Sequence, residues 1–340
     1  MKRAFGSAVV LMIFLFGGAF LVSRTPEEAP AYASAAAPQP VSTDVTDYVH
    51  DADTVLRVLC GDTVEEIPLH EYLCGVVRGE MLPTFSTAAL QAQAAAERTY
   101  IYYQLAHGGK TAHPRADVCT DPGCCNAYLS EDSARRKWGA RYEEYNALIE
   151  QAVSDTDGQV VLYENQPILA VFHSSSAGST AASGDVWLAD LPYLASVESP
   201  ETGEGIPNYY SVNTYSAEEF SRLFRTTYPA ADLSDAPETW VQALQTRGER
   251  VSSAVIGGVT VTGKDLRSLF GLRSTAFTLD YSQNVFTFHV TGYGHGVGMS
   301  QYGANQLGLE GKTWQEILEW YYTGTKVGYF QNEEVKAENR

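Results

Sequence analysis

One acidic residue, Glu80, stands where an apolar pattern ends and a bend begins. From Leu69 to Val77 apolar residues recur every three or four positions, as on the buried face of a helix, and Pro83 follows shortly after. A carboxyl group between closely packed helices is desolvated, and desolvation raises its pKa toward the range of a general acid. The alternative is that Glu80 is an ordinary solvated charge at a helix end.

A second group of reactive side chains lies between residues 113 and 125. It contains His113, Cys119, Cys124 and Cys125, in a stretch without apolar periodicity. Nitrogen and sulfur ligands suit a tetrahedral zinc ion, which we expect to be structural and to hold the loop 107–128. Because adjacent cysteines rarely bind one ion without strain, Cys124 is either a fourth ligand or a bystander. The alternative is a disulfide between Cys119 and Cys124 or Cys125.

Two polar segments could line a binding groove. The segment Phe172–Thr180 is rich in serine, and the segment Gly292–Ala304 alternates glycine with other residues. Hydroxyl groups and a nearby aromatic ring, such as that of Trp187, are typical of sugar-binding grooves. The glycines do not form a phosphate loop, because no Lys-Ser/Thr pair follows them. The alternatives are a plain serine-rich loop and a packing role for His295.

These residues need a scaffold of helices and strands to position them. The helix 69–80 and an alanine-rich helix 86–98 are expected to pack closely around the acid. The whole pattern predicts a mixed α/β fold, with one domain that carries an elongated insertion at 199–257. Further helices are expected at 143–153, 217–224, 239–246, 299–307 and 313–322, and strands at 55–60, 159–163, 167–173, 255–261, 276–281 and 285–291.

The N-terminal region differs from the rest of the chain. Lys2 and Arg3 precede an apolar run from Ala4 to Val22, about the length that crosses a bilayer. The basic residues place the following domain outside the cytoplasm. A cleaved signal peptide is the alternative. We therefore divide the chain into a transmembrane anchor (1–24), an extracytoplasmic linker (25–46), the folded domain (47–330) and a polar tail (331–340).

Charge limits the class of partner. The net charge is −18, from 41 acidic and 23 basic residues, and no basic cluster is present in the sequence. A protein of this charge repels polyanions, so nucleic acid is excluded as a partner. A neutral polymer such as a glycan is compatible with this balance.

Four segments together resemble the SpoIID/LytB family. They are Tyr72–Met81, Ala89–Tyr100, the serine-rich segment and the glycine-rich segment, and the resemblance extends from about Val55 to Thr325. The chain departs from the family pattern at Glu97, where a small residue is usual, and at Ala177, which replaces a glycine. The order of the segments along the chain agrees with the family.

The resemblance implies an enzyme. Glu80 matches the catalytic acid of a lytic transglycosylase, which cleaves peptidoglycan glycan strands between N-acetylmuramic acid and N-acetylglucosamine and leaves 1,6-anhydro ends. Zinc ligands in similar proteins match His113, Cys119 and Cys125. The residues expected to contact the substrate are Arg98, His173, Ser174, Ser175, Ser176, Thr180, His295, Ser300 and Gln301.

The resemblance also implies a setting and a rival function. The substrate would be strands that a cell-wall amidase of the SpoIIP type has stripped of stem peptides during engulfment in sporulation. The domain would be held by the mother-cell membrane and face the intermembrane space. The rival is a glycan-binding protein that activates an amidase and cleaves nothing. A zinc hydrolase is disfavoured because the sequence has no His-Glu-x-x-His motif.

Overall fold

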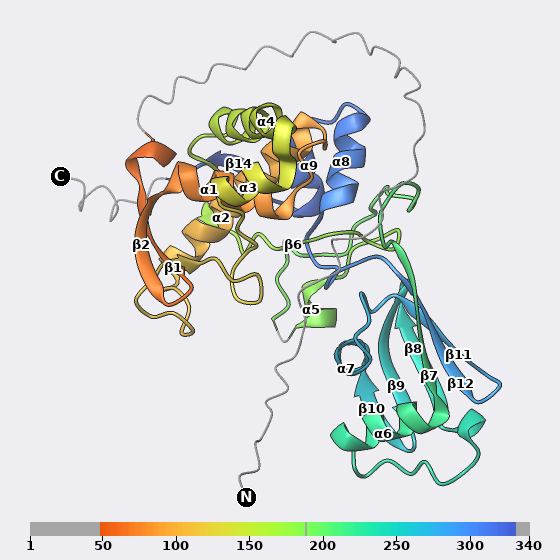
Figure 1. Ribbon diagram of the computed structural model, residues 1–340. Coiled ribbons are helices and arrows are strands. Elements are labelled where there is room, and N and C mark those ends of the chain that lie inside the picture. Colours follow the sequence, from red (N-terminus) through yellow and green to blue (C-terminus); the bar gives the residue numbers. More distant parts are fainter. Residues whose placement is uncertain (1–47, 188, 331–340) are drawn as a thin grey trace, which may run out of the picture. The chain divides into compact units, whose positions relative to one another are not determined.

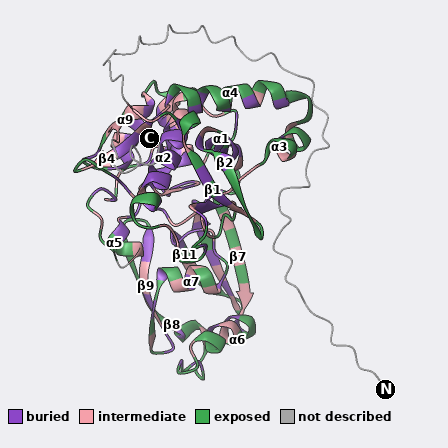
Figure 2. Cartoon of the chain, turned by 90° about the vertical axis from the view of Figure 1, so that its left-hand side faces the viewer, coloured by how far each residue is buried: buried purple, intermediate pink, exposed green. Residues whose placement is uncertain are grey.

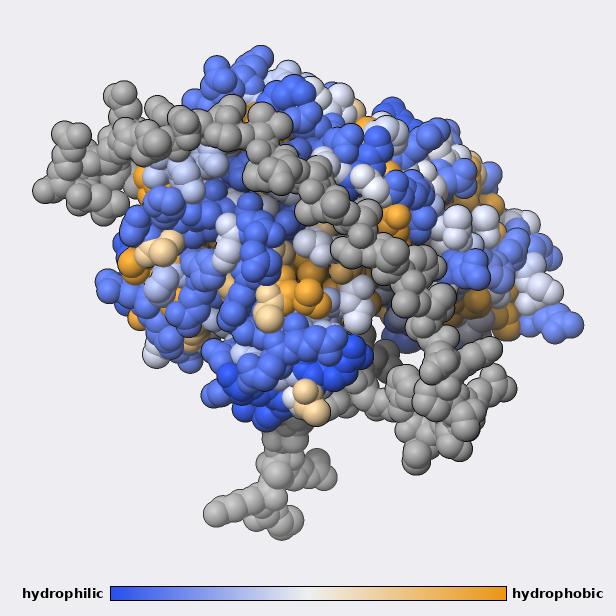
Figure 3. Space-filling view, turned by 90° about the horizontal axis from the view of Figure 1, so that it is seen from above, coloured by the Kyte–Doolittle hydropathy of each residue, from blue (hydrophilic) through white to orange (hydrophobic). Residues whose placement is uncertain are grey.

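The computed structural model describes residues 48–187 and 189–330 (Figure 1). The predicted membrane helix, the linker and the polar tail lie outside these ranges. Within them, no helix is both long enough and apolar enough to span a bilayer. On the face drawn in Figure 3, hydrophilic residues predominate and hydrophobic ones show mainly as small separate patches. The described residues build a mixed α/β fold around two hydrophobic cores.

The helix α2 (Thr87–Ala106) is the centre of the first core. Ser86 caps it, because its Oγ accepts a hydrogen bond of 3.3 Å from the N–H of Ala89. The alanines at 89, 92, 94, 95 and 96 are completely buried, and their small side chains let other helices approach closely. Figure 2 shows that α1 and α2 are largely buried, whereas α4 carries many exposed residues. The helices packed against α2 are α1 (Leu69–Glu80), α4 (Tyr142–Asp155), α8 (Gln301–Leu309) and α9 (Trp314–Tyr321).

Three small sheets belong to this first core. The strand β1 (Val55–Cys60) lies between β2 (Thr63–Pro68) and β3 (Val118–Cys119). Parallel pairing of β13 (Met299–Ser300) with β6 (Phe172–His173) brings the serine-rich and glycine-rich segments side by side. The third sheet has the order β14 (Lys326–Tyr329), β4 (Gln159–Tyr163) and β5 (Gln166–Pro167).

The predicted insertion has a hydrophobic core of its own. Phe220 lies at its centre, with its ring stacked 4.1 Å from that of Phe286 and 4.8 Å from that of Phe270. This core extends to Val290, well beyond the boundary at residue 257 that the sequence suggested. It is built from the sheet β7 (Tyr210–Ser216), β12 (Val285–Thr291), β11 (Phe277–Ser282), the sheet β8 (Val241–Arg247), β9 (Arg250–Ile256), β10 (Val259–Thr262), and the helices α6 (Ala217–Thr227) and α7 (Gly263–Leu269).

Two predictions in this region were wrong. The expected helix at 239–246 is mostly the strand β8, which pairs with β9 across a turn at Gly248. Hairpin pairing with β9, the next strand along the chain, here outweighs the weak preference of this segment for helix. The single strand expected at 255–261 is two strands, because Gly257 and Gly258 adopt positive φ angles of 54° and 77° and reverse the chain.

The structure confirms the predicted helices 69–80, 143–153 and 217–224 and the hairpin of β11 and β12. The alanine-rich helix expected at 86–98 is α2, which continues to Ala106. The sequence pattern missed several short elements. They include α3 (Glu131–Trp138), α5 (Ser183–Val186), the strands β2, β3, β7 and β14, and the 3-10 helices at Asp51–Asp53, Gly139–Arg141 and Pro237–Thr239.

Candidate active site

Glu80 is the last residue of α1, and groups from two distant parts of the chain hold its carboxylate. The N–H of Ala127 donates to Oε1 over 2.6 Å. The side-chain amide of Gln301, the first residue of α8, donates to Oε2 over 3.4 Å. The structure therefore brings together the predicted acid and the predicted glycine-rich segment, and it adds Ala127, which the sequence gave no reason to select.

Burial dominates the electrostatics of this carboxyl group. It raises the pKa of Glu80 above the ordinary value, and the hydrogen bonds from Ala127 and Gln301 oppose that shift. The balance favours a carboxylic acid that keeps its proton at higher pH than a solvated one. Such a group is suited to donate a proton to a leaving oxygen.

Two glycines of α1 let the loop after the cysteine cluster reach the acid. A Cβ atom at Gly79 would lie 2.4 Å from the carbonyl oxygen of Ala127, and one at Gly75 would lie 2.1 Å from the ring of Tyr128. Any side chain at these positions would push the loop away. These glycines therefore account for the short hydrogen bond between Ala127 and Glu80.

Glu97 lies close to Glu80 but inside the protein. It is completely buried, and its oxygens accept hydrogen bonds from Gln93 (2.8 Å) and Asn126 (2.5 Å). Burial raises its pKa well above the ordinary value, and the charge of Glu80 raises it further. Both effects favour the neutral form of Glu97, which opposes a second negative charge beside Glu80.

Arg98 does not face a groove, contrary to the expected substrate contact. Its side chain is completely buried, and its guanidinium pairs with Asp51 at 2.6 Å. It also donates to Thr156 and to the carbonyl oxygen of Gln159. A buried guanidinium needs several acceptors, and these satisfy it. Arg98 therefore fastens the first turn of the domain to α2 and α4.

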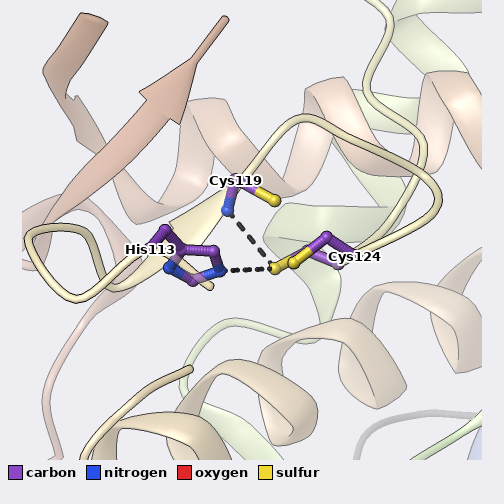
Figure 4. A group of neighbouring side chains, drawn as sticks. His113, Cys119 and Cys124 are labelled. Carbon is purple, nitrogen blue, oxygen red and sulfur yellow. Dashed lines mark hydrogen bonds between the residues drawn. The ribbon is translucent and has the colours of Figure 1, made fainter. Parts of the chain in front are cut away.

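The predicted metal cluster is brought together. The ligand atoms of His113, Cys119, Cys124 and Cys125 all lie within 4.8 Å of one another. Figure 4 shows the imidazole of His113 directed at the cysteine sulfurs. The Nε2 of His113 lies 3.3 Å from the Sγ of Cys125. All five cysteines of the chain are free thiols, so the alternative disulfide is absent from this structure.

The donor set fits a tetrahedral ion. A tetrahedral zinc separates neighbouring sulfur ligands by about 3.7 Å, which a small movement from the present arrangement achieves. The Nδ1 of His113 lies 3.0 Å from the carbonyl oxygen of Ala116, and a carbonyl oxygen can only accept. The proton of the neutral ring is therefore on Nδ1, and Nε2 is left free to bind a metal.

The loop that carries the cluster also contacts the acid. Cys125 is followed by Asn126, which donates to Glu97, and by Ala127, whose N–H donates to Glu80. An ion that fixed Cys125 would therefore fix the backbone donor of Glu80 two residues later. The sequence selected both features as candidates but gave no sign that this loop links them.

The serine-rich segment forms a buried network instead of an open groove. His173, Ser175, Ser176, Thr180 and Ser300 are each at most 4% exposed. The Nδ1 of His173 donates to the carbonyl oxygen of Val297, so its Nε2 accepts from the hydroxyl of Ser176 over 2.6 Å. Burial lowers the pKa of His173 well below its ordinary value, which agrees with a neutral ring.

The prediction of direct substrate contacts by these five residues is therefore revised, because their side chains do not reach the surface. Ser174 and His295 are only partly buried and remain predicted contacts. Gln301 is largely buried, but it contacts Glu80. Burial and the charge of Arg267 lower the pKa of His295 to about 4, so its ring is neutral at ordinary pH.

A carboxylate that the sequence analysis missed organises this network. Glu201 is 5% exposed and accepts hydrogen bonds from the N–H of Ser176 (2.6 Å) and from the hydroxyls of Ser199 and Ser300. A Cβ atom at Gly303 would lie 2.6 Å from its Oε2, so the Gln-Tyr-Gly sequence leaves room for this carboxylate. An acid in a long irregular stretch carries no periodic signal, which is why Glu201 was not selected.

Comparison with known proteins agrees with the segments described above. A sequence model of the family described as Stage II sporulation protein matches residues 61–163. The chain is 38% identical over 265 residues to Stage II sporulation protein D of Bacillus subtilis (strain 168), which covers 78% of this chain and 76% of that protein. The protein of the same name from Bacillus amyloliquefaciens is 36% identical over 78% of this chain and 75% of its own length. An amidase enhancer of Bacillus subtilis (strain 168) is 26% identical over 75% of this chain and 40% of its own length.

Proposed function

Because the chain belongs to the stage II sporulation protein D family, we propose that it is a lytic transglycosylase of the cell wall. It cleaves peptidoglycan glycan strands between N-acetylmuramic acid and N-acetylglucosamine. The observation that carries the proposal is the Glu80 carboxyl group, whose burial raises its pKa and whose two oxygens are oriented by Ala127 and Gln301.

The reaction needs one group that first gives and then takes a proton. Protonated Glu80 donates to the glycosidic oxygen as the bond from that oxygen to C1 of N-acetylmuramic acid breaks. The Glu80 carboxylate then accepts the proton of the C6 hydroxyl of the same sugar as O6 bonds to C1. The products are a 1,6-anhydro end and a free hydroxyl on N-acetylglucosamine, so no water is consumed.

The neighbourhood of Glu80 supports this single-acid route over hydrolysis by two carboxylates. A hydrolase needs a second carboxylate that reaches the sugar or a water molecule. Glu97 is completely buried and hydrogen-bonded to Gln93 and Asn126, so it can do neither. The Ala127 N–H and the Gln301 amide stabilise the carboxylate that forms after the first proton transfer.

His113, Cys119 and Cys125, with Cys124 as a fourth ligand, would hold a structural zinc ion. When bound, the ion supplies four bonds that fix the loop 107–128 and does no chemistry on the substrate. The metal ligands would also hold the backbone from Cys125 through Asn126, and this backbone keeps the N–H of Ala127 against Glu80.

The setting is part of the proposal. The basic residues before the apolar run from Ala4 to Val22 support an N-terminal anchor with the domain outside the cytoplasm. The family supports a role in sporulation, on strands that an amidase of the SpoIIP type has freed of stem peptides. The net charge of −18 argues against nucleic acid as a partner.

The test is digestion of peptide-free glycan strands by the domain from residue 47 onward, with mass spectrometry of the products. We expect chains that end in 1,6-anhydro-N-acetylmuramic acid, and we expect Glu80→Gln to form none. Reducing ends would instead mean that water is the acceptor, and the single-acid route would be wrong.

The likeness to an amidase enhancer favours one second candidate, a non-catalytic activator of a cell-wall amidase. The same preparation distinguishes the two functions. If no strand is cleaved while a SpoIIP-type amidase is accelerated equally by the original chain and by Glu80→Gln, the activator is the correct function.

A further inference from the structure

A cavity of about 480 Å³ lies apart from Glu80, between the short helix α5 and the hairpin of β8 and β9. Figure 1 shows α5 next to α7 and these strands. The start of α7 closes one side of the cavity. Glu80, Gln301 and the metal cluster do not line it, so the proposed reaction leaves it unexplained.

The charge of its lining is opposite to that of the protein. The chain carries a net charge of −18, yet Arg247, Arg250 and Lys264 line the cavity against a single acid, Asp185. Asp185 is already paired with Arg247. Among the described residues, Arg250 and Lys264 have no acidic partner within ion-pair distance, so the cavity retains an excess of positive charge.

Among these cations, Arg250 gives the strongest evidence for a bound anion. It is 8% exposed, and none of its three guanidinium nitrogens has a hydrogen-bond partner among the described residues. The nearby carboxylate of Glu201 is bonded to Ser176, Ser199 and Ser300 instead. Burial and Arg267 lower the pKa of Arg250 to about 10, so it stays charged at neutral pH. A buried, unpaired cation is costly, and an anion in the cavity would offset that cost.

The rest of the wall suits a sugar. Trp187 lies in the wall of the cavity, and so do the hydroxyl-bearing residues Ser179, Ser252 and Thr262. The hydroxyl of Thr262 also caps α7, and that of Ser252 donates to the carbonyl oxygen of Gln245. Aromatic planes and hydroxyls are the groups that sugar sites use. Cations alone would suit any anion, whereas this combination suits an acidic sugar.

The cavity is connected to the acid through the glycine-rich segment. The rings of Trp187 and His295 are 5.3 Å apart, and the guanidinium of Arg250 packs on Gly296, where a Cβ atom would lie 2.3 Å from its Cζ. Six residues after His295, Gln301 reaches Glu80. Six residues span at most about 20 Å, so one glycan strand can cover both places.

We propose that this cavity binds the carboxylate of an N-acetylmuramic acid residue in the strand that Glu80 cleaves. Arg250 supplies charge at the inner wall, and Lys264 and Arg247 supply donors at the mouth. The lactyl carboxylate of this sugar is free only after its stem peptide is removed, because the peptide is attached to it as an amide. The site would thus recognise strands without peptides, and this assignment rests on the proposed function.

The test is calorimetric binding in the Glu80→Gln background, which prevents cleavage. The ligands are peptide-free glycan strands, strands that keep their stem peptides, and an uncharged chitin oligosaccharide of equal length. The test variant is Arg247→Gln with Lys264→Gln, both exposed residues whose loss should not disturb folding. The control is Arg136→Gln with Lys137→Gln, which removes the same charge from α3 away from the cavity. Arg250→Met is a further variant, used only if its thermal unfolding is unchanged.

We expect the test variant to bind peptide-free strands about tenfold more weakly, to bind chitin as before, and the control to change neither. Equal losses for both ligands, or no loss for either, would overturn the carboxylate site. The original chain could instead bind peptide-bearing strands more tightly than peptide-free ones. If the test variant lost this preference, the cavity would be assigned to peptide carboxylates. Binding is measured without turnover. The carboxylate site can therefore be confirmed even if the strand-cleavage assay shows no cleavage, and cleavage can be confirmed even if the carboxylate site is overturned.

Discussion

Adjacent residues at the start of α8 hold two carboxyl groups, the partly buried Glu80 and the buried Glu201, in opposite ways. Ser300 donates to Glu201, and the next residue, Gln301, donates to Glu80. Glu201 accepts three hydrogen bonds from serine groups. Glu80 accepts two, of which the one from Gln301 is long at 3.4 Å.

This difference in hydrogen bonding distinguishes a structural carboxylate from one that is suited to proton transfer. A carboxylate with several donors is stabilised in its charged form and fixes the loops that supply those donors. A carboxyl group that is desolvated but only partly satisfied keeps its proton longer and can give it away. We therefore expect Glu201 to matter for stability and Glu80 for catalysis.

The largest expected effect is on catalysis at Glu80. Glu80→Gln should lower the rate of strand cleavage by about 10²- to 10⁴-fold, because the amide cannot donate the proton. Its thermal unfolding should be unchanged. Since cleavage needs the protonated acid and burial raises the pKa of Glu80, the rate of the original chain should fall as pH rises through that raised pKa. Glu71→Gln, an exposed change on the same helix, is the control, and an equally inactive control would contradict the assignment.

The opposite result is expected at Glu201. Glu201→Ala should lower the free energy of unfolding by about 3 kcal/mol, because the serine donors lose a charged acceptor inside the protein. Urea denaturation measures this loss. The exposed Glu198→Ala should change stability by less than about 0.5 kcal/mol. If both variants were equally stable, Glu201 would not be the centre of the network.

Metal removal should have a smaller effect that reaches Glu80 indirectly. Chelation should speed amide hydrogen exchange in residues 107–128 and reduce cleavage about tenfold, because the Ala127 N–H loses its fixed position. The amides of α2 should stay protected. Cys119→Ser should reproduce the effect and Cys60→Ser, outside the cluster, should not. Complete unfolding of the metal-free protein would contradict a local role.

The smallest effect is expected at Glu97, in the pH dependence of stability. Its pKa is raised in the folded state, so the folded protein holds this proton more tightly than the unfolded chain. The resulting stability is complete below the ordinary value of 4.5 and is lost as pH rises through the raised pKa. Glu97→Gln should flatten that loss, as urea denaturation across the pH range would measure. An unchanged slope would mean that Glu97 is ionised in the folded protein.

Long periodic elements and the hairpin of β11 and β12 could be predicted, whereas several other paired strands could not. The apolar spacing from Leu69 to Val77 identified α1 to the residue. The strand β8 was mistaken for a helix because the spacing of apolar residues within β8 does not show that it pairs with β9. The two-residue strands β6 and β13 exist only because they lie beside each other.

The sequence by itself determined which residues are candidates for chemistry: the acid at a helix end, the His and Cys residues in an unpatterned loop, and the glycines before α8. These depend on residue type and local order, which the sequence contains. Only the tertiary structure decided that Arg98 is buried, that Glu201 joins the serines, and that Ala127 and Gln301 orient Glu80. Burial and hydrogen bonding between distant segments depend on how the cores pack, and packing is a property of the whole fold.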